Sequence, residues 1–472
     1  MAKFLGIGLS TSPYICAYSW SGGWGTRQSA PTTLPNSITN RARFIANRAI
    51  LTANDSSPYL NAWAWSDSGF GSKYSDPSTI PGSTAASFVG FNKKTSSIAV
   101  TNNTSPRIYA YPWSNGFGTK HTDPAAAVGS NAQGLAFRNS DTNDAIVVGQ
   151  SSTPYLKAYP WSSSGFGTAY SDPSTLPAAQ CYGGEFAPSG NAVAMGSSAT
   201  GVRLYVYAWS SSGFGSKYAN PATVPAGASQ YPQFSPKGDY LIVGHSTTPF
   251  VSVYPWSDST GFGTKLSNPS TTNGANTRDN AVNSEDIALG QSPNGVVSPV
   301  AVFPWSSSGF GTRYAEPSTT VDSAKTATAW GVTWNWNEYT LTANQQSFSL
   351  TGIAANLTKA SSGTAYTITA SQGSFTLTGT DASFQTGKTI TASEGSFALT
   401  GVSANLKTGK TITASHGSFA LTGSDADLFW TVAGDSYSIA VDPGAFNVLA
   451  SETQFHVDRS VFCENGTISV TG

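Results

Sequence analysis

The sequence predicts an all-β protein, in which a seven-bladed β-propeller closed by a strand from its far end precedes a smaller repeated β-domain. Seven copies of a phrase such as YPWSSSGFGT (159–168) recur every 45 to 49 residues. Gly and Pro interrupt these copies every few residues and leave no helical period. A second phrase, of the GSFALTG type, takes over after Trp336. Repeats of about 40 to 50 residues made of short strands are typical of four-stranded propeller blades.

A Trp followed by Ser anchors each copy of the first phrase. The seven anchors are Trp20, Trp65, Trp113, Trp161, Trp209, Trp256 and Trp305. A catalytic motif normally occurs once, so we interpret a phrase that returns at a fixed interval as architectural. We predict that each Trp wedges between two adjacent blades.

One repeat, residues 182–221, can be divided into an inner, a second, a third and an outer strand. In the third strand, VRLYVYAW, alternation puts Leu204 and Val206 on one face and Tyr205, Tyr207 and Trp209 on the other. Two apolar faces are expected in a propeller, because each face of a blade meets a neighbouring blade.

The first blade lacks an inner strand at the N-terminus. The stretch from Phe4, FLGIGLSTSPYICAYSW, matches the second and third strands of later copies. Residues 326–336 follow the seventh phrase and supply a candidate for the missing strand. We therefore predict a ring over residues 1–336 whose closure removes exposed sheet edges.

Residues 337–428 carry the second repeat, with units of about 22 residues. Its four anchors are Phe348, Phe375, Phe397 and Phe419. We predict two short strands per unit, stacked on the next copy through Phe and Leu, and leave open whether they form a sandwich or a β-stack. Residues 429–472 break the period and are interpreted as a cap or docking element, with a hairpin at Asn465-Gly466.

The composition excludes several classes of partner. Charged residues make up 10% of the chain and the net charge is −1, against roughly 25% charged residues in ordinary soluble proteins. Such weak fields do not favour nucleic acid. The chain has no apolar run of about 18 residues, so membrane insertion is not expected, and no signal peptide is recognised. Cys16 and Cys181 are expected to be buried free thiols, as is Cys463, for which a bond between chains is the alternative.

Residues that depart from the repeat are the place to look for chemistry. Arg41, Arg43 and Arg48 cluster around the inner strand of the second blade, and TRDNAVNSEDIALG places Arg278, Asp279, Glu285 and Asp286 in the corresponding part of a later blade. They are weak candidates for binding a ligand in the central channel. The simpler interpretation is that they solvate the channel and form an ion pair across it. Glu285 and Asp286 could also be an acid–base pair.

No catalytic triad, phosphate loop or zinc signature is found. The four histidines stand alone, and Asp76, Asp123 and Asp172 each precede a Pro, which favours a turn-forming role. The sequence therefore predicts no catalytic residue, no metal and no cofactor.

The propeller phrase, with YSDPSTLP after it, resembles a repeat of virion proteins from tailed bacteriophages. It is similar to WD-type propellers in length and Trp placement, with Trp-Ser in place of Trp-Asp, and GSFALTG also resembles repeats in phage structural proteins. The resemblance implies a non-enzymatic virion component (a capsid decoration, head-fibre or tail-associated protein) that assembles in the host cytoplasm with other virion proteins. A homo-oligomer formed through the C-terminal region is a further expectation. The alternatives are a tail protein that binds a host glycan or protein, and a polysaccharide-cleaving propeller.

Overall fold

The computed structural model describes residues 3–335 except 46–48, 83, 140–143, 272–274, 293–297 and 323–325. Beyond residue 335 it describes the backbone of strands between 341 and 471. The chain divides into two compact units, Ala2–Trp336 and Asn337–Gly472.

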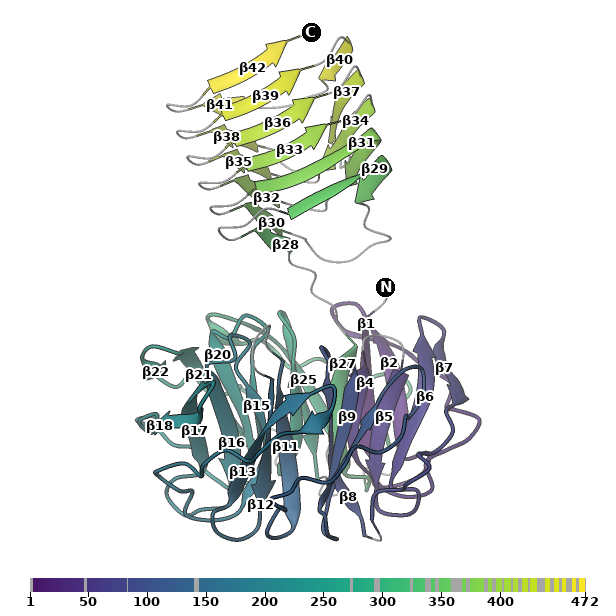
Figure 1. Cartoon of the computed structure of the whole chain (residues 1–472), viewed down its shortest axis with the longest axis vertical. Coiled ribbons are helices and arrows are strands. Elements are labelled where there is room, and N and C mark those ends of the chain that lie inside the picture. The colour runs from purple at the N-terminus through teal and green to yellow at the C-terminus, as the bar shows by residue number, and fades with distance from the viewer. Residues whose placement is uncertain are drawn as a thin grey trace. The chain divides into compact units, whose positions relative to one another are not determined.

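The first unit consists of seven antiparallel sheets, whose strands run from purple to green in Figure 1. The inner strands are β4 (Thr39–Ile45), β8 (Ala86–Asn92), β11 (Ala132–Arg138), β15 (Cys181–Phe186), β19 (Ser229–Phe234), β23 (Thr277–Val282) and β27 (Ala329–Asn335). Each inner strand contacts the next around the axis, so the ring is closed. The predicted seven-bladed propeller is confirmed.

The remaining strands of each blade follow outward from the axis. The second strands are β1 (Lys3–Leu9), β5 (Ala49–Asn54), β9 (Ser97–Asn102), β12 (Ala145–Gln150), β16 (Ala192–Ser197), β20 (Tyr240–His245) and β24 (Asp286–Gln291). The third strands are β2 (Ile15–Trp20), β6 (Leu60–Ser66), β10 (Ile108–Pro112), β13 (Leu156–Ser162), β17 (Leu204–Ser210), β21 (Val251–Ser257) and β25 (Val300–Ser306). The outer strands are β3 (Trp24–Arg27), β7 (Gly69–Lys73), β14 (Gly165–Phe166), β18 (Gly213–Lys217), β22 (Gly261–Phe262) and β26 (Gly309–Phe310). In the third blade a single bridge, Trp113 to Phe117, takes the outer position.

The strand that closes the ring is the one expected from the sequence. β27 pairs antiparallel with β1, with Asn335 opposite Phe4 and Ala329 opposite Leu9. The first blade is thus completed by residues more than 300 positions away along the chain.

The aromatic anchors lie between blades, as predicted. Trp161, for example, is 4% exposed and packs with His121 of the preceding blade and Phe137 of its own. Its ring meets Phe166 edge to face at a centroid distance of 5.0 Å, a favourable aromatic geometry. Trp20 joins the first blade to the last, and Trp305 is the one anchor that is partly exposed.

The second unit is built from parallel strands. One sheet contains β28 (Leu341–Ala343), β30 (Thr367–Ala370), β32 (Thr389–Ala392), β35 (Thr411–Ala414), β38 (Ser438–Val441) and β41 (Val461–Cys463). The other contains β29 (Phe348–Leu357), β31 (Ser374–Gln385), β33 (Ser396–Thr400), β34 (Ser403–Thr408), β36 (Ser418–Thr422), β37 (Asp425–Trp430), β39 (Ala445–Leu449), β40 (Glu452–Phe455) and β42 (Thr467–Thr471).

Successive copies of the second repeat pair in register. The backbone of Phe375 lies opposite Phe348 on one side and Phe397 on the other, and Phe397 lies opposite Phe419. This backbone pairing is parallel and joins equivalent residues of successive copies. It continues beyond residue 428, because β39 pairs with β36 and β42 with β39.

The hairpin predicted at Asn465-Gly466 lies outside the described residues. The strands on either side of it do not pair with each other: β41 pairs with β38 in one sheet, and β42 with β39 in the other. An Asn-Gly turn favours local antiparallel pairing. The flanking strands instead pair in parallel with earlier strands of the two sheets.

Candidate functional site

Every inner strand of the propeller carries a shift in register one residue after it begins. In β4, for example, Thr39 and Arg41 face neighbouring residues of β5, and Asn40 is the extra residue between them. The same shift recurs in the other blades. A bulge leaves its extra residue unpaired and re-aims its side chain.

We call the seven residues at this position the entrance ring. They are Asn40, Ser87, Gln133, Tyr182, Gln230, Arg278 and Trp330. All seven are partly exposed, whereas the residues before and after each of them are buried. The far ends of the same strands differ, because the side chains of Asn92, Arg138 and Asn335 there are buried.

Several side chains that follow the entrance ring on the inner strands pack together at the axis. Phe88 and Tyr231 come from blades on opposite sides of the ring, and their rings lie 5.0 Å apart. The Arg41 guanidinium lies 4.9 Å from the Phe88 ring centre, and that of Arg43 lies 5.0 Å from Tyr231. A Cβ atom added at Gly183 would come within 2.4 Å of the Tyr231 ring, so glycine is required there for the aromatic contact.

The expectation that the arginines solvate an open channel is therefore wrong for Arg41 and Arg43. Side chains from several blades pack against one another across the axis at this level, and the two guanidinium groups are part of that packing. Arg48, the third member of the predicted cluster, lies outside the described residues.

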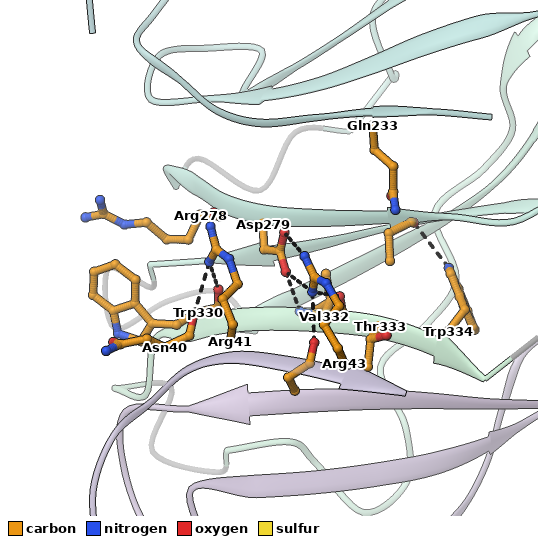
Figure 2. A network of polar contacts seen from close by, with 12 residues as sticks. Asn40, Arg41, Arg43, Gln233, Arg278, Asp279, Trp330, Val332, Thr333 and Trp334 are labelled. Atoms are coloured by element: carbon orange, nitrogen blue, oxygen red, sulfur yellow. Dashed lines mark hydrogen bonds and ion pairs between the residues drawn. The ribbon is translucent and has the colours of Figure 1, made fainter. Parts of the chain in front are cut away.

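The ion pair expected across the axis forms between Arg43 and Asp279 (Figure 2). Arg43 Nη1 donates to Asp279 Oδ2 at 3.0 Å, and Nη2 donates to Oδ1 at 3.4 Å. The backbone N–H of Val332 donates to the same carboxylate at 3.0 Å. Burial lowers the pKa of Arg43, but the charges of Asp279 and Tyr231 and the hydrogen bonds to both side chains together outweigh burial, so the pKa is raised overall. The pair links the second and seventh blades through the closing strand.

Arg41 is buried, and among the described residues it has no direct carboxylate partner. Its guanidinium donates to the backbone carbonyls of Trp330, Asn40 and Arg278. Its Nε atom has no partner among the described residues. Burial lowers the pKa of Arg41, and the charges of Arg43 and Arg278 act in the same direction, against that of Asp279.

Glu185 is the second carboxyl group near the axis, and sequence reasoning did not single it out. Its Oε2 accepts a hydrogen bond from the backbone N–H of Phe234 at 2.8 Å. Burial raises its pKa to about 7, against the opposing effects of that hydrogen bond and of the charges of Arg43 and Lys93.

Arg278 lies in the entrance ring itself. Its guanidinium is 4.7 Å from the Trp330 ring centre, and its Nε donates to Ser292 Oγ at 2.7 Å. Figure 2 shows this side chain beside Trp330 and extending away from the Arg43–Asp279 pair. Burial lowers its pKa, and nearby Tyr182 partly offsets that effect.

Glu285 and Asp286 do not lie with the axial arginines, contrary to the sequence-based placement. The inner strand ends at Val282, and Asp286 already begins the second strand, β24. Asp286 accepts hydrogen bonds from Trp20 Nε1 at 2.9 Å and from the Tyr314 hydroxyl at 3.0 Å. Burial raises its pKa, and these hydrogen bonds oppose the rise.

Glu285 forms a 2.9 Å ion pair with Lys3 and is 44% exposed at its side chain. The two carboxyl groups therefore join the seventh blade to the first. Their partners give them a structural use that the sequence pattern did not reveal.

Other predicted groups are placed as follows. Cys16 and Cys181 are buried free thiols, as expected, and the side chain of Cys463 lies outside the described residues. Asp76 and Asp123 pair with nearby lysines on the surface. In the described part of the chain, no three His, Cys, Asp or Glu residues gather as metal ligands would. Over the same residues, no helix has the length and hydrophobicity to cross a membrane.

Comparison with known proteins finds the propeller fold in solved structures. A protein from Lactobacillus plantarum matches with a TM-score of 0.53 and 12% identity, over 70% of this chain and 99% of its own. A functionally unknown protein from Desulfotomaculum acetoxidans matches with a TM-score of 0.51 and 12% identity, over 70% and 98%. A periplasmic gluconolactonase from Pseudomonas aeruginosa gives a TM-score of 0.51 and 13% identity, over 67% and 96%. At these identities the likeness shows the fold alone.

No family model matches this chain, and no curated protein matches it. The chain is thus a seven-bladed propeller related in fold to lactonase-like propellers, and its activity must be argued from its own residues.

The entrance ring is the part of the site that sequence reasoning missed. Its seven members are of six residue types, and each follows a small residue, such as Thr39, Ala132 or Thr277. In the sequence, the available signal was a position that varies between blades directly after a position that is always small. The bulge that exposes this position depends on the pairing with the second strand, so the local sequence alone does not predict it.

Proposed function

We propose that this chain is a non-enzymatic structural component of a bacteriophage particle, which docks through its C-terminal β region and displays the propeller. One observation carries the proposal: the charged residues that depart from the repeat are used to hold blades together. Arg43 and Asp279 link the second and seventh blades over the closing strand, and Glu285 and Asp286 link the seventh blade to the first. An enzyme needs such groups free to face a substrate.

The repeats support the same proposal. Both phrases resemble those of virion proteins, and the second builds an in-register parallel stack whose backbone pairing does not depend on a ligand. Such a stack suits a docking element, and its terminal strands suit assembly with another copy of this chain. In this proposal the partners are other virion proteins, with neither nucleic acid nor membrane insertion involved, and the location is the virion.

Immunogold electron microscopy tests the proposal. An antibody raised against the propeller is applied to intact particles from the source that carries this sequence. Label over the head supports a decoration role, and label on the tail or its tip supports a tail-associated role. Absence of label from every particle, with the epitope shown to be accessible on the purified protein, overturns the virion assignment.

A second candidate function is recognition of a host glycan or protein. The observation that favours it is a difference between the two ends of the inner strands: among the described residues, one end carries a ring of partly exposed aromatic and polar residues, whereas Asn92, Arg138 and Asn335 at the other end are buried. Label confined to the tail tip would bring this candidate to first place.

A polysaccharide-cleaving enzyme is the least supported alternative. It needs two carboxyl groups facing one substrate, and Glu285 and Asp286 are engaged by Lys3 and Trp20. Release of sugar from host surface polysaccharide that disappears in a Glu285→Gln, Asp286→Asn variant would overturn the non-enzymatic proposal.

A further inference from the structure

We infer that the entrance ring binds a carboxylated glycan, with Arg278 holding the carboxylate. The inference does not depend on the virion assignment, because a purified chain would bind such a ligand whether or not it belongs to a particle. Electron microscopy tests the virion assignment and the binding assay tests the ring, so either proposal can be wrong without the other.

The repeat supplies the first argument. Six of the seven ring members are neutral, and they include three amides, one hydroxyl and two aromatic rings. A position required only for folding should be similar in all blades, as the residue before it is, which is small in every blade. Here the side chains differ from blade to blade while the bulge that exposes them is kept. Bulges at a rim that re-aim side chains in this way are typical of functional positions.

Charge supplies the second argument. Arg278 is the charged member of the ring, and the buried Arg41 lies just behind it with its guanidinium bonded to the Arg278 carbonyl at 3.2 Å. The carboxylate of Asp279 is engaged by Arg43. A buried cation without a direct counter-ion is costly, and an anion at the ring would reduce that cost for Arg41.

The orientation of Arg278 supplies the third argument. Trp330 holds the guanidinium plane from one side, and Ser292 holds its Nε. The two terminal nitrogens donate to no partner among the described residues and form the fork that fits a carboxylate. A phosphate, with a charge of about −1.5 to −2, would favour more than one exposed cation.

The neutral members of the ring suit the remainder of a sugar. Gln133 and Gln230 offer amide donors and acceptors for hydroxyl groups. Tyr182 is close enough to interact with the charge of Arg278 and adds a second aromatic side chain to the ring. Asn40 is already committed, because its amide donates to Asp55 at 2.6 Å and to the Ala86 carbonyl at 2.9 Å.

The test is binding of the full chain to immobilised glycans presented as matched pairs. Each uronic- or sialic-acid glycan stands beside its methyl ester, which keeps the sugar and removes the charge. We expect binding to acidic members and at least tenfold weaker binding to their esters. Binding to both members alike, or to none, overturns the inference.

An Arg278→Gln variant locates the site. Gln occupies the same ring position in two other blades, so the melting temperature should not change, while affinity for the acidic glycan should fall at least tenfold. The control is Arg313→Gln, which removes the same charge after the outer strand β26 of the same blade. An equal loss of affinity in the two variants overturns the assignment of the site to the ring. The inference is also overturned if inorganic phosphate competes with the acidic glycan as effectively as galacturonate does.

Discussion

His245 illustrates at the residue scale how one position is filled differently in different blades. It ends the second strand β20 opposite Ser229, where Gln150 lies opposite Ala132 and Gln291 opposite Thr277. His245 is fully buried, and its Nε2 lies 3.1 Å from Ser252 Oγ. Burial lowers its pKa from 6.5 to about 4.

This shift predicts acid sensitivity. The folded pKa lies below the unfolded one, so the contribution of His245 is complete above pH 6.5 and is lost as the pH falls toward 4. The loss amounts to roughly 3 kcal/mol. His245→Gln should remove this part of the pH dependence, measured as the free energy of unfolding at pH 7 and at pH 4.

Glu185 acts in the opposite direction, because its folded pKa is raised from 4.5 to about 7. Its contribution is present below pH 4.5 and is lost as the pH rises through 7. Glu185 is present in the wild-type protein and in the His245→Gln variant. The difference between their free energies of unfolding therefore reports the effect of His245 alone. If the free energy of unfolding changed equally between pH 7 and pH 4 in the wild type and the variant, the prediction would be wrong.

The axial ion pair makes a second prediction at this scale. Asp279→Asn should destabilise the propeller by about 3–5 kcal/mol, because it leaves buried guanidinium groups without a counter-charge. The control is Asp123→Asn, which breaks a surface pair with Lys120 and should cost under about 1 kcal/mol. Denaturant unfolding measures both, and similar costs would show that the axial pair has no special role.

The structural element of this protein is the blade, and its core is shared between neighbours. Tyr205, Tyr207 and Trp209 of β17 pack toward the preceding blade, while Leu204 and Val206 of the same strand pack toward the next. A blade therefore has no separate hydrophobic core, and its stability comes from its two interfaces.

Truncating an anchor should test that view. Trp161→Ala should cost about 3–5 kcal/mol, because it empties a well-packed contact between two blades. Leu176 is 39% exposed, and Leu176→Ala should change the free energy of unfolding by less than about 0.5 kcal/mol. A small effect of Trp161→Ala would mean that the phrase is kept for a reason other than packing.

Sequence reasoning succeeded where a feature repeats or is local. The Trp spacing predicted the number of blades, and strand alternation predicted the two faces of β17. It was wrong for Glu285 and Asp286, because a turn moves them from the inner strand onto β24, toward Trp20. It could not choose between sandwich and stack, because parallel or antiparallel pairing is decided by contacts far apart along the chain.

At the scale of the whole molecule, the propeller depends on its last strand. Without β27 the edge of β1 is unpaired, and the axial network loses the Val332 backbone groups that meet Arg43 and Asp279. An unpaired edge of a sheet promotes aggregation.

Two fragments test this dependence. Residues 2–336 should give a soluble fragment with a single cooperative unfolding transition. Residues 2–325, which lack the closing strand, should aggregate or melt at a clearly lower temperature. Circular dichroism and light scattering measure both properties, and equal behaviour of the two fragments would show that closure contributes little.

The antiparallel pairing of β1 with β27 has a mechanical consequence. Phe4 lies opposite Asn335, so the chain enters and leaves the ring at the same end of one strand pair. Tension between these two points would pull β1 and β27 apart from that end. The hydrogen bonds of the pair would then break one after another, which is unzipping, and each would bear the load alone. If the protein is held only by the segment that follows Asn335, a pull on the propeller does not load the pair in this way. A single tether therefore spares the ring from the one direction of force that would open it most easily.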